Sequence, residues 1–293
     1  MVAGPIVARD YAPMMQRLPM VLWLVCALGL SGAADADVPR RVVSFNLCAD
    51  QLVVALADPS QIAGLSPYAA DAGLSVVAEE ARRFRRLDWQ AEATILLQPD
   101  LVFVGPNDRP VTRRVLAAQG LRVVETAFVT DLESARRQIV KVADLLGQSE
   151  RGARLVEKLD AARARLAARR QKQPLTALVV ERGGYTQGPS SLAATLLATA
   201  GLVPPPGAPA GYGGFIPLEK LLTLKPDILF VKDPPQYPQD QGALYFMHPA
   251  VQALYPPERR IALPTRYTMC GGPALVAAFD YLADALGRMP PAR

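Results

Sequence analysis

The sequence contains very little histidine, cysteine and tryptophan. Of 293 residues, one is His, three are Cys and two are Trp. A protein that carries a bare transition-metal ion normally supplies several imidazoles together with carboxylates. The single His248 is therefore interpreted as a capping or surface residue, and the sequence predicts neither a metal site nor a resident cofactor.

Motifs of the common enzyme classes are missing as well. Ser190-Ser191 has no obvious His partner, and neither a Gly-x-Ser-x-Gly elbow nor a P-loop occurs. Gly183-Gly184 and Gly271-Gly272 are interpreted as turn glycines. The net charge of +5 is modest, and no basic stripe alternates with aromatic residues. We therefore expect a protein that is not an enzyme and has no nucleic-acid partner.

The first 36 residues have the pattern of a secretory signal peptide. Arg9 and Arg17 precede the apolar run Leu18 to Leu30, and Ala34-Asp35-Ala36 offers a cleavage site with small residues. A membrane anchor is the alternative, but the run of about 13 residues is shorter than the ~20 that a spanning helix needs. The sequence predicts an exported, soluble mature protein that occupies residues 37–293.

One long amphipathic helix is predicted near the middle of the chain, from Ser149 to Gln171. Apolar side chains recur with helical spacing at Leu155, Leu159, Ala162 and Leu166. Ser149 is a suitable N-cap, and roughly 23 residues would give a rod of ~34 Å.

Two copies of one sequence unit flank this helix. Residues 92–104 read EATILLQPDLVFV and residues 219–231 read EKLLTLKPDILFV. The coinciding residues are Glu92/Glu219, Leu97/Leu224, Pro99/Pro226, Asp100/Asp227, Phe103/Phe230 and Val104/Val231. Each unit predicts a short helix, a Pro-Asp corner and a strand buried on both faces of a parallel sheet.

The predicted fold class is α/β, with two lobes of mainly parallel sheet joined by one long rigid helix. The expected divisions are a signal peptide at 1–36, an N-terminal lobe at 37–148, the connecting helix at 149–173 and a C-terminal lobe at 174–293. Ligands of open α/β sheets lie beyond the carboxyl ends of the strands. Residues in the loops at these ends are therefore candidate site residues, and we expect them to line a cleft between the lobes.

Several loops at predicted strand ends carry Arg, Tyr and Cys. The candidate ligand-binding residues are Phe45, Cys48, Tyr68, Arg182, Tyr185, Tyr212, Arg266, Tyr267 and Cys270. Arg offers a planar fork to carboxylate, catecholate or phosphate, and Tyr can stack on a flat ring or ligate iron. This inventory favours an anionic or aromatic chelate over a sugar or a free amino acid, although solvated loop charges would leave the same pattern.

Taken together, the leader, the segment RVVSFNLCADQLVVALAD, the repeated Glu-x5-Leu-x-Pro-Asp unit and the long helix resemble the class III periplasmic solute-binding proteins of ABC importers. That family carries vitamin B12, ferric siderophores and haem. The resemblance implies a periplasmic monomer that holds a metal chelate or corrinoid and delivers it to a permease and ATPase complex of the inner membrane. A periplasmic sensor or metallo-chaperone of the same fold is the alternative.

The resemblance also implies roles for individual residues. One surface Glu of each lobe docks onto the permease in this family, and the matching residues are Glu92 and Glu219. The sequence places no Trp in the expected cleft loops, since Trp89 is the only one after residue 36, and this argues against a corrinoid ligand.

Cys48 and Cys270 are the only cysteines left after processing. Both are expected in loops between a strand end and the next helix. Three alternatives remain open, namely a disulfide between the lobes, two thiolates that contact the ligand, and two unconnected thiols.

Overall fold

Two sheets and the helices around them make up the described part of the chain, which comprises residue 4 and residues 38–106, 109–232 and 244–289 of the computed structural model. The predicted signal peptide lies outside this part, apart from Gly4. Residues Val38–Arg293 form one unit by their contacts. Within the described residues, the helices are all too short or too polar to cross a membrane.

The first half of the chain contains four strands and five α-helices among the described residues. They are β1 (Val42–Ser44), α1 (Leu47–Leu56), β2 (Ile62–Gly64), α2 (Ala78–Ala81), α3 (Ala91–Ile95), β3 (Leu101–Val104), α4 (Pro110–Ala118), β4 (Val123–Glu125) and α5 (Leu132–Leu145). The helix α6 (Ser149–Ala167) follows.

The second half begins after α6. Its described strands and α-helices are β5 (Ala177–Val180), β6 (Tyr185–Gln187), α7 (Leu192–Thr199), β7 (Gly213–Phe215), α8 (Leu218–Leu224), β8 (Ile228–Val231), α9 (Leu244–Met247), α10 (Pro249–Leu254), β9 (Arg260–Ala262) and α11 (Pro273–Gly287).

The first sheet has the order β2-β1-β3-β4, and every pairing in it is parallel. Strand β3 is buried along its whole length. Leu101 and Phe103 pack into the core that contains α1 and α5, whereas Val102 and Val104 pack on the opposite face. Helices thus cover both faces of the sheet, which is why the sequence of β3 is continuously apolar. This confirms the predicted parallel sheet.

The second sheet has the order β7-β6-β5-β8-β9. Strands β5, β8 and β9 are parallel, but β6 and β7 pair antiparallel at one edge. Sequence analysis placed Tyr185 in a loop, and this prediction is wrong because Tyr185 begins β6. Gly213 shows why no strand pattern was visible. It has φ 126°, and a Cβ there would lie 2.0 Å from the Thr186 carbonyl oxygen, so a strand-favouring side chain cannot occupy the position.

The repeated unit forms the same corner twice. Gln98 and Lys225 both have left-handed backbone conformations directly before their Pro. The carboxylate of Asp100 then accepts from the Arg40 amide at 2.7 Å, and that of Asp227 accepts from the Thr176 amide at 2.7 Å. Each Asp therefore fastens the start of its strand to the segment that leads into the neighbouring central strand.

Helix α6 is shorter than predicted and begins differently. It ends at Ala167, so its 19 residues span ~28 Å. Ser149 is the first helical residue, so the N-cap position falls on Gln148, and the Ser149 hydroxyl donates to Asp144 Oδ1 at 2.7 Å. Beyond the helix, Arg170 Nε donates to the Thr199 carbonyl, and this bond holds the segment after α6 against the end of α7.

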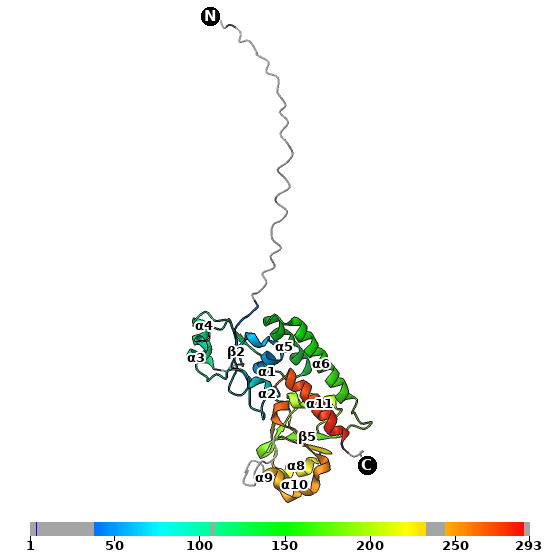
Figure 1. Ribbon diagram of the computed structural model, residues 1–293. Coiled ribbons are helices and arrows are strands. Elements are labelled where there is room, and N and C mark those ends of the chain that lie inside the picture. Colours follow the sequence, from blue (N-terminus) through cyan, green and yellow to red (C-terminus); the bar gives the residue numbers. More distant parts are fainter. Residues whose placement is uncertain (1–3, 5–37, 107–108, 233–243, 290–293) are drawn as a thin grey trace. The chain divides into compact units, whose positions relative to one another are not determined.

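The predicted apolar stripe of α6 is confirmed. Leu159, Ala162 and Leu166 are fully buried, and Leu155 is half-buried. Helix α6 packs against α5 from the first half and against α11 from the second, as Figure 1 shows. One apolar core therefore runs through both halves of the chain.

Replacing Asp227 with Ala should destabilise the protein by about 1–3 kcal/mol, because the Thr176 amide and hydroxyl, which both bond Oδ2 at 2.7 Å, lose a charged acceptor. Urea denaturation measures the change. Asp284→Ala is the matched control, since Asp284 is an exposed residue of α11 and its loss should stay within about 0.5 kcal/mol. Equal stability of the two variants would contradict this account of the corner.

Candidate functional site

An aromatic cluster with one arginine lies at the carboxyl edge of the first sheet. We call it the Trp89 cluster, and it consists of Phe45, Tyr68, Trp89 and Arg109. The Trp89 ring lies 6.3 Å from the Phe45 ring and 5.5 Å from the Tyr68 ring, between ring centroids. The Arg109 guanidinium carbon lies 3.5 Å from the centre of a Trp89 ring. Tyr68 is 47% exposed, whereas Phe45 is only 1% exposed.

The parallel sheet explains why these residues meet. Phe45 directly follows β1, Tyr68 lies in the loop after β2, and Arg109 follows β3 at the N-cap of α4. Carboxyl ends of parallel strands lie at one edge, so three separate segments converge there. Phe45 was predicted to contact ligand. Its burial corrects this prediction, because the ring supports Trp89 and offers no free face.

Sequence analysis missed Trp89 and Arg109. Trp89 was expected to lie away from the cleft loops, but it contacts two residues of those loops, and the argument against a corrinoid is therefore wrong. Arg109 could have been found, because it follows the β3 strand just as Tyr68 follows β2. Nothing in the sequence around Trp89 indicated its contacts.

A buried carboxylate lies beneath the Tyr68 loop. Asp50 lies in the first turn of α1, a helix that begins at Leu47 because the Asn46 side chain caps the amides of Cys48 and Ala49. Asp50 is fully buried and accepts from the Ser66 hydroxyl at 2.5 Å. Burial raises the pKa of Asp50 to about 7, against hydrogen bonds from Ser44 and Ser66 that lower it.

A second aromatic group lies on the antiparallel edge of the second sheet. Tyr185, in β6, stacks edge-on against Phe215 at 5.2 Å and donates its hydroxyl proton to the Tyr212 carbonyl at 3.3 Å. The Tyr212 side chain is 67% exposed. Arg182 is exposed in the segment just before β6. These three predicted site residues therefore lie on one edge of the sheet.

A partly buried ion pair follows two strands of the second sheet. Lys232 follows β8 and is 9% exposed, and its Nζ lies 3.0 Å from Oε1 of Glu181, which follows β5. The side-chain amide of Gln187 also donates to the Glu181 carboxylate. Sequence analysis missed this pair, although the same rule of strand ends would have found both residues.

Arg266 and Tyr267 have structural partners. The Arg266 guanidinium donates to the Ala72 carbonyl at 3.0 Å, which joins the loop after β9 to the loop region after β2. Tyr267 stacks on Tyr281 of α11 with ring centroids 4.8 Å apart. Arg266 thus lies where the two halves meet, whereas one face of Tyr267 is covered by its own half.

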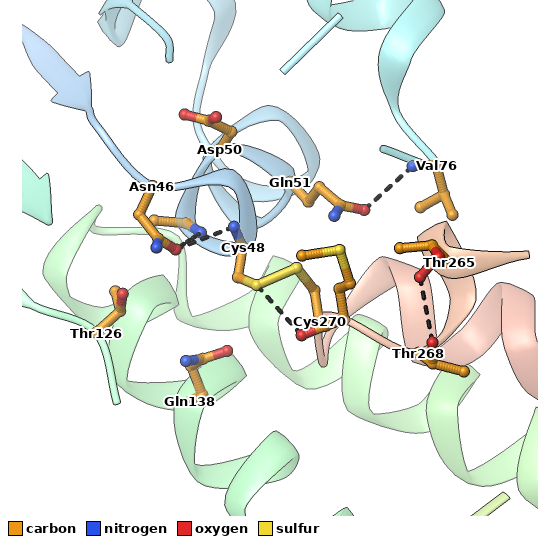
Figure 2. The surroundings of a disulfide bond; sticks show 12 residues. Asn46, Cys48, Asp50, Gln51, Val76, Thr126, Gln138, Thr265, Thr268 and Cys270 are labelled. Carbon is orange, nitrogen blue, oxygen red and sulfur yellow. Dashed lines mark hydrogen bonds between the residues drawn. A yellow bond between two sulfur atoms is a disulfide. The ribbon is translucent and has the colours of Figure 1, made fainter. Parts of the chain in front are cut away.

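Cys48 and Cys270 form a disulfide in this structure. Figure 2 shows the bond between the first turn of α1 and the segment that leads to α11. Cys48 lies inside α1 and not in a loop as predicted, whereas Cys270 lies in a loop as predicted and is 1% exposed. Of the three alternatives, the disulfide is the one that the structure has, and thiolate contact with a ligand does not fit it.

The remaining predicted residues lie on the surface. Glu92 of α3 and Glu219 of α8 are both exposed, at equivalent places in the two repeats. His248 accepts from the Ala250 amide at 3.2 Å and caps α10, which confirms its interpretation as a capping residue. Among the described residues, no group of three or more His, Cys, Asp or Glu could hold a metal ion.

The sequence of this chain matches the model of a family described as periplasmic binding protein over residues 42–245, and the chain belongs to that family. It is therefore a solute-binding protein that serves transport, and not an enzyme. The family implies a periplasmic location, a small-molecule ligand and interaction with an ABC transporter. No curated protein matches the chain significantly.

Solved structures share its fold at low sequence identity. The periplasmic haem-binding protein RhuT from Roseiflexus sp. RS-1 is 24% identical, with a TM-score of 0.66, and the match covers 84% of this chain and 97% of RhuT. A periplasmic haem-binding protein from Pseudomonas aeruginosa is 21% identical, with a TM-score of 0.68 and coverage of 87% and 95%. A protein from the Fe3+-hydroxamate transport system of Saccharomonospora viridis is 22% identical, with a TM-score of 0.63 and coverage of 85% and 93%.

Replacing both Cys48 and Cys270 with Ser should lower the unfolding free energy. The bond joins residues separated by 222 positions, and the chain-entropy estimate for so large a loop is about 5 kcal/mol, an upper value because measured effects often fall short. Denaturation with and without reductant measures the loss, and reductant should leave the double variant unchanged. Complete alkylation of both cysteines in the unreduced native protein would show that the bond is absent.

Proposed function

We propose that this protein is the solute-binding component of an ABC importer that binds an iron chelate, with haem as the best candidate, and delivers it to an inner-membrane permease. The observation that carries this proposal is the Trp89 cluster, with its half-exposed Tyr68 and an arginine over the indole. Membership of the periplasmic binding protein family supports the role of carrier. Ferric siderophores and cobalamin are the competing ligands.

The chemistry of the cluster suits a flat anionic chelate. Haem has a wide aromatic face, two carboxylates and an iron that accepts an oxygen ligand. The exposed part of Tyr68 can meet the face or the iron, and a guanidinium fork can pair with a carboxylate. Phe45 and Trp89 support the Tyr68 ring from within the lobe. Two fold neighbours are described as haem-binding proteins, which agrees with this choice.

The second half of the chain offers a matching set of groups. Arg182 and Tyr212 are exposed, and Tyr185 holds the Tyr212 backbone in place. We propose that these residues meet the other face or edge of the ligand, so that it lies between the two halves. Helix α6 would then permit only a small closure, because a continuous packed helix resists bending.

The purified protein should bind hemin with a dissociation constant below ~10 μM, equivalent to about 7 kcal/mol, without altering it chemically. Absorbance titration measures this, with a ferric trihydroxamate and cyanocobalamin as competing probes. Tyr68→Ala and Arg109→Gln should each weaken binding roughly tenfold, the value of about 1.4 kcal/mol for one lost contact.

Phe128→Ala is the matched control for these variants. Phe128 is an aromatic residue of the same half that is 73% exposed and lies outside the cluster. Its replacement should leave hemin affinity unchanged. Failure of all three probes to bind the wild-type protein would refute the carrier function, and tight binding of another probe alone would replace haem as the ligand.

Glu92 and Glu219 are proposed as contacts to the permease. Both are exposed, and surface charges contribute little to stability, so the double Ala variant should keep its melting temperature within a few degrees and its hemin affinity. Uptake of ligand through the cognate permease should fall. Glu150→Ala combined with Glu157→Ala, at exposed positions of α6, is the control. Normal uptake by the Glu92/Glu219 variant would show that these residues do not dock.

A further inference from the structure

The buried Asp50 is connected to the exposed Tyr68 by a continuous series of hydrogen bonds. The Ser66 amide donates to Asp50 Oδ1 at 3.2 Å, and the Ser66 hydroxyl donates to Oδ2 at 2.5 Å. The same Ser66 oxygen accepts from the Tyr68 amide at 3.3 Å. Asp50 and Ser66 are both fully buried, so water does not replace these bonds. A single serine therefore links a buried carboxylate to the loop of the Trp89 cluster.

We propose that Asp50 is a positioning residue for the ligand site, and that gain or loss of its proton changes how firmly the Tyr68 loop is held. The ligand part of this inference rests on the proposed function, but the loop part does not. Asp50 touches no ligand in this account. It acts only through Ser66 on the place of the Tyr68 ring against Trp89.

The direction of the effect follows from donors and acceptors. An ionised carboxylate accepts both Ser66 bonds, and bonds to a charged acceptor are the stronger ones. When one oxygen takes up a proton, that oxygen becomes a donor. A proton on Oδ1 would point at the Ser66 amide proton, which is also a donor. A proton on Oδ2 would take the place of the Ser66 hydroxyl proton, so that the hydroxyl could no longer donate to this oxygen. The Tyr68 loop should therefore be held more firmly at higher pH.

The surroundings of Asp50 place this transition near neutrality. Burial raises the pKa of Asp50 to about 7, and a charged side chain is not among the causes of the shift. The helices α5 and α11, which pack against α1, contribute apolar side chains to the shared core. Their charged residues are exposed or half-buried, namely Glu133, Arg136, Arg137, Lys141, Asp144, Asp280 and Asp284.

Figure 2 shows that Asp50 and Cys48 share the first part of α1, with the carboxylate directed away from the disulfide. The carboxylate is thus on a helix that is covalently fixed to the other half of the chain. When the Asp50–Ser66 bonds change, α1 stays in place and the loop carries the displacement.

Trp89 provides a test that needs no ligand. In a Trp23→Phe background Trp89 is the only tryptophan, and its fluorescence should change between pH 6 and pH 8, with a midpoint near the pKa of about 7. Asp50→Asn, which cannot titrate, should abolish the transition. His248→Gln, which removes the only His, should leave it intact.

Ser66→Ala serves as the second variant, because it keeps Asp50 and removes the hydroxyl bridge. It should fold, and its Trp89 fluorescence should no longer follow the ionisation of Asp50. A transition that persists in either Asp50→Asn or Ser66→Ala would overturn the inference, as would a wild-type protein whose Trp89 fluorescence is constant over this range.

Hemin titration at pH 6 and pH 8 supplies the functional arm. Affinity of the wild-type protein should be several-fold higher at pH 8, and this difference should be lost in Asp50→Asn. An identical pH dependence in both proteins would overturn the positioning role. If hemin binds neither protein while the Trp89 transition behaves as expected, the proposed ligand fails and the coupling between Asp50 and Tyr68 stands.

Discussion

Helix α6 lies between α5 from the first half and α11 from the second, with Leu159, Ala162 and Leu166 fully buried between them. Each buried leucine contributes on the order of 1.5–3 kcal/mol by removing its side chain from water. Because one core crosses this contact, the two sheets are parts of a single packed body and not independent lobes on a linker. This shared core therefore holds the loops at the two sheet edges in position.

The bonds near α1 complete this arrangement. The disulfide joins α1 to the segment before α11, and Arg266 donates to the Ala72 carbonyl close to the Tyr68 loop. Both lie where the halves meet. The Trp89 cluster and the Tyr185 edge are therefore presented by surfaces whose relative motion is limited by a helix, a covalent bond and a charged hydrogen bond.

Much of the fold could be predicted from the sequence, because it repeats. The unit around Asp100 recurs around Asp227, and one physical explanation of the Pro-Asp corner accounts for both copies. The parallel strands were visible as continuous apolar runs. Strands β6 and β7 were not visible in the sequence. Gly213 is needed in β7 because it lies against Thr186 of β6, and this contact exists only in the folded chain.

The site was less predictable for a related reason. Rules about strand ends predicted Tyr68, Arg182 and Tyr212 as candidates from their local position along the chain, and all three side chains are exposed in the structure. They could not find Trp89, because it precedes a helix and reaches the loops through contacts with Phe45, Tyr68 and Arg109, which are distant in sequence. Nor could they show that Phe45 is buried or that Tyr267 stacks on Tyr281, because burial is decided by residues distant in sequence.

The position of the disulfide also bears on how the protein matures. Cys48 lies near the beginning of the described chain and Cys270 near its end. A polypeptide that crosses a membrane from its N-terminus exposes Cys48 to oxidants long before Cys270 arrives. For such a polypeptide, the bond between Cys48 and Cys270 could form only after residue 270 had been translocated. Oxidation of this pair would then report that translocation had passed this residue.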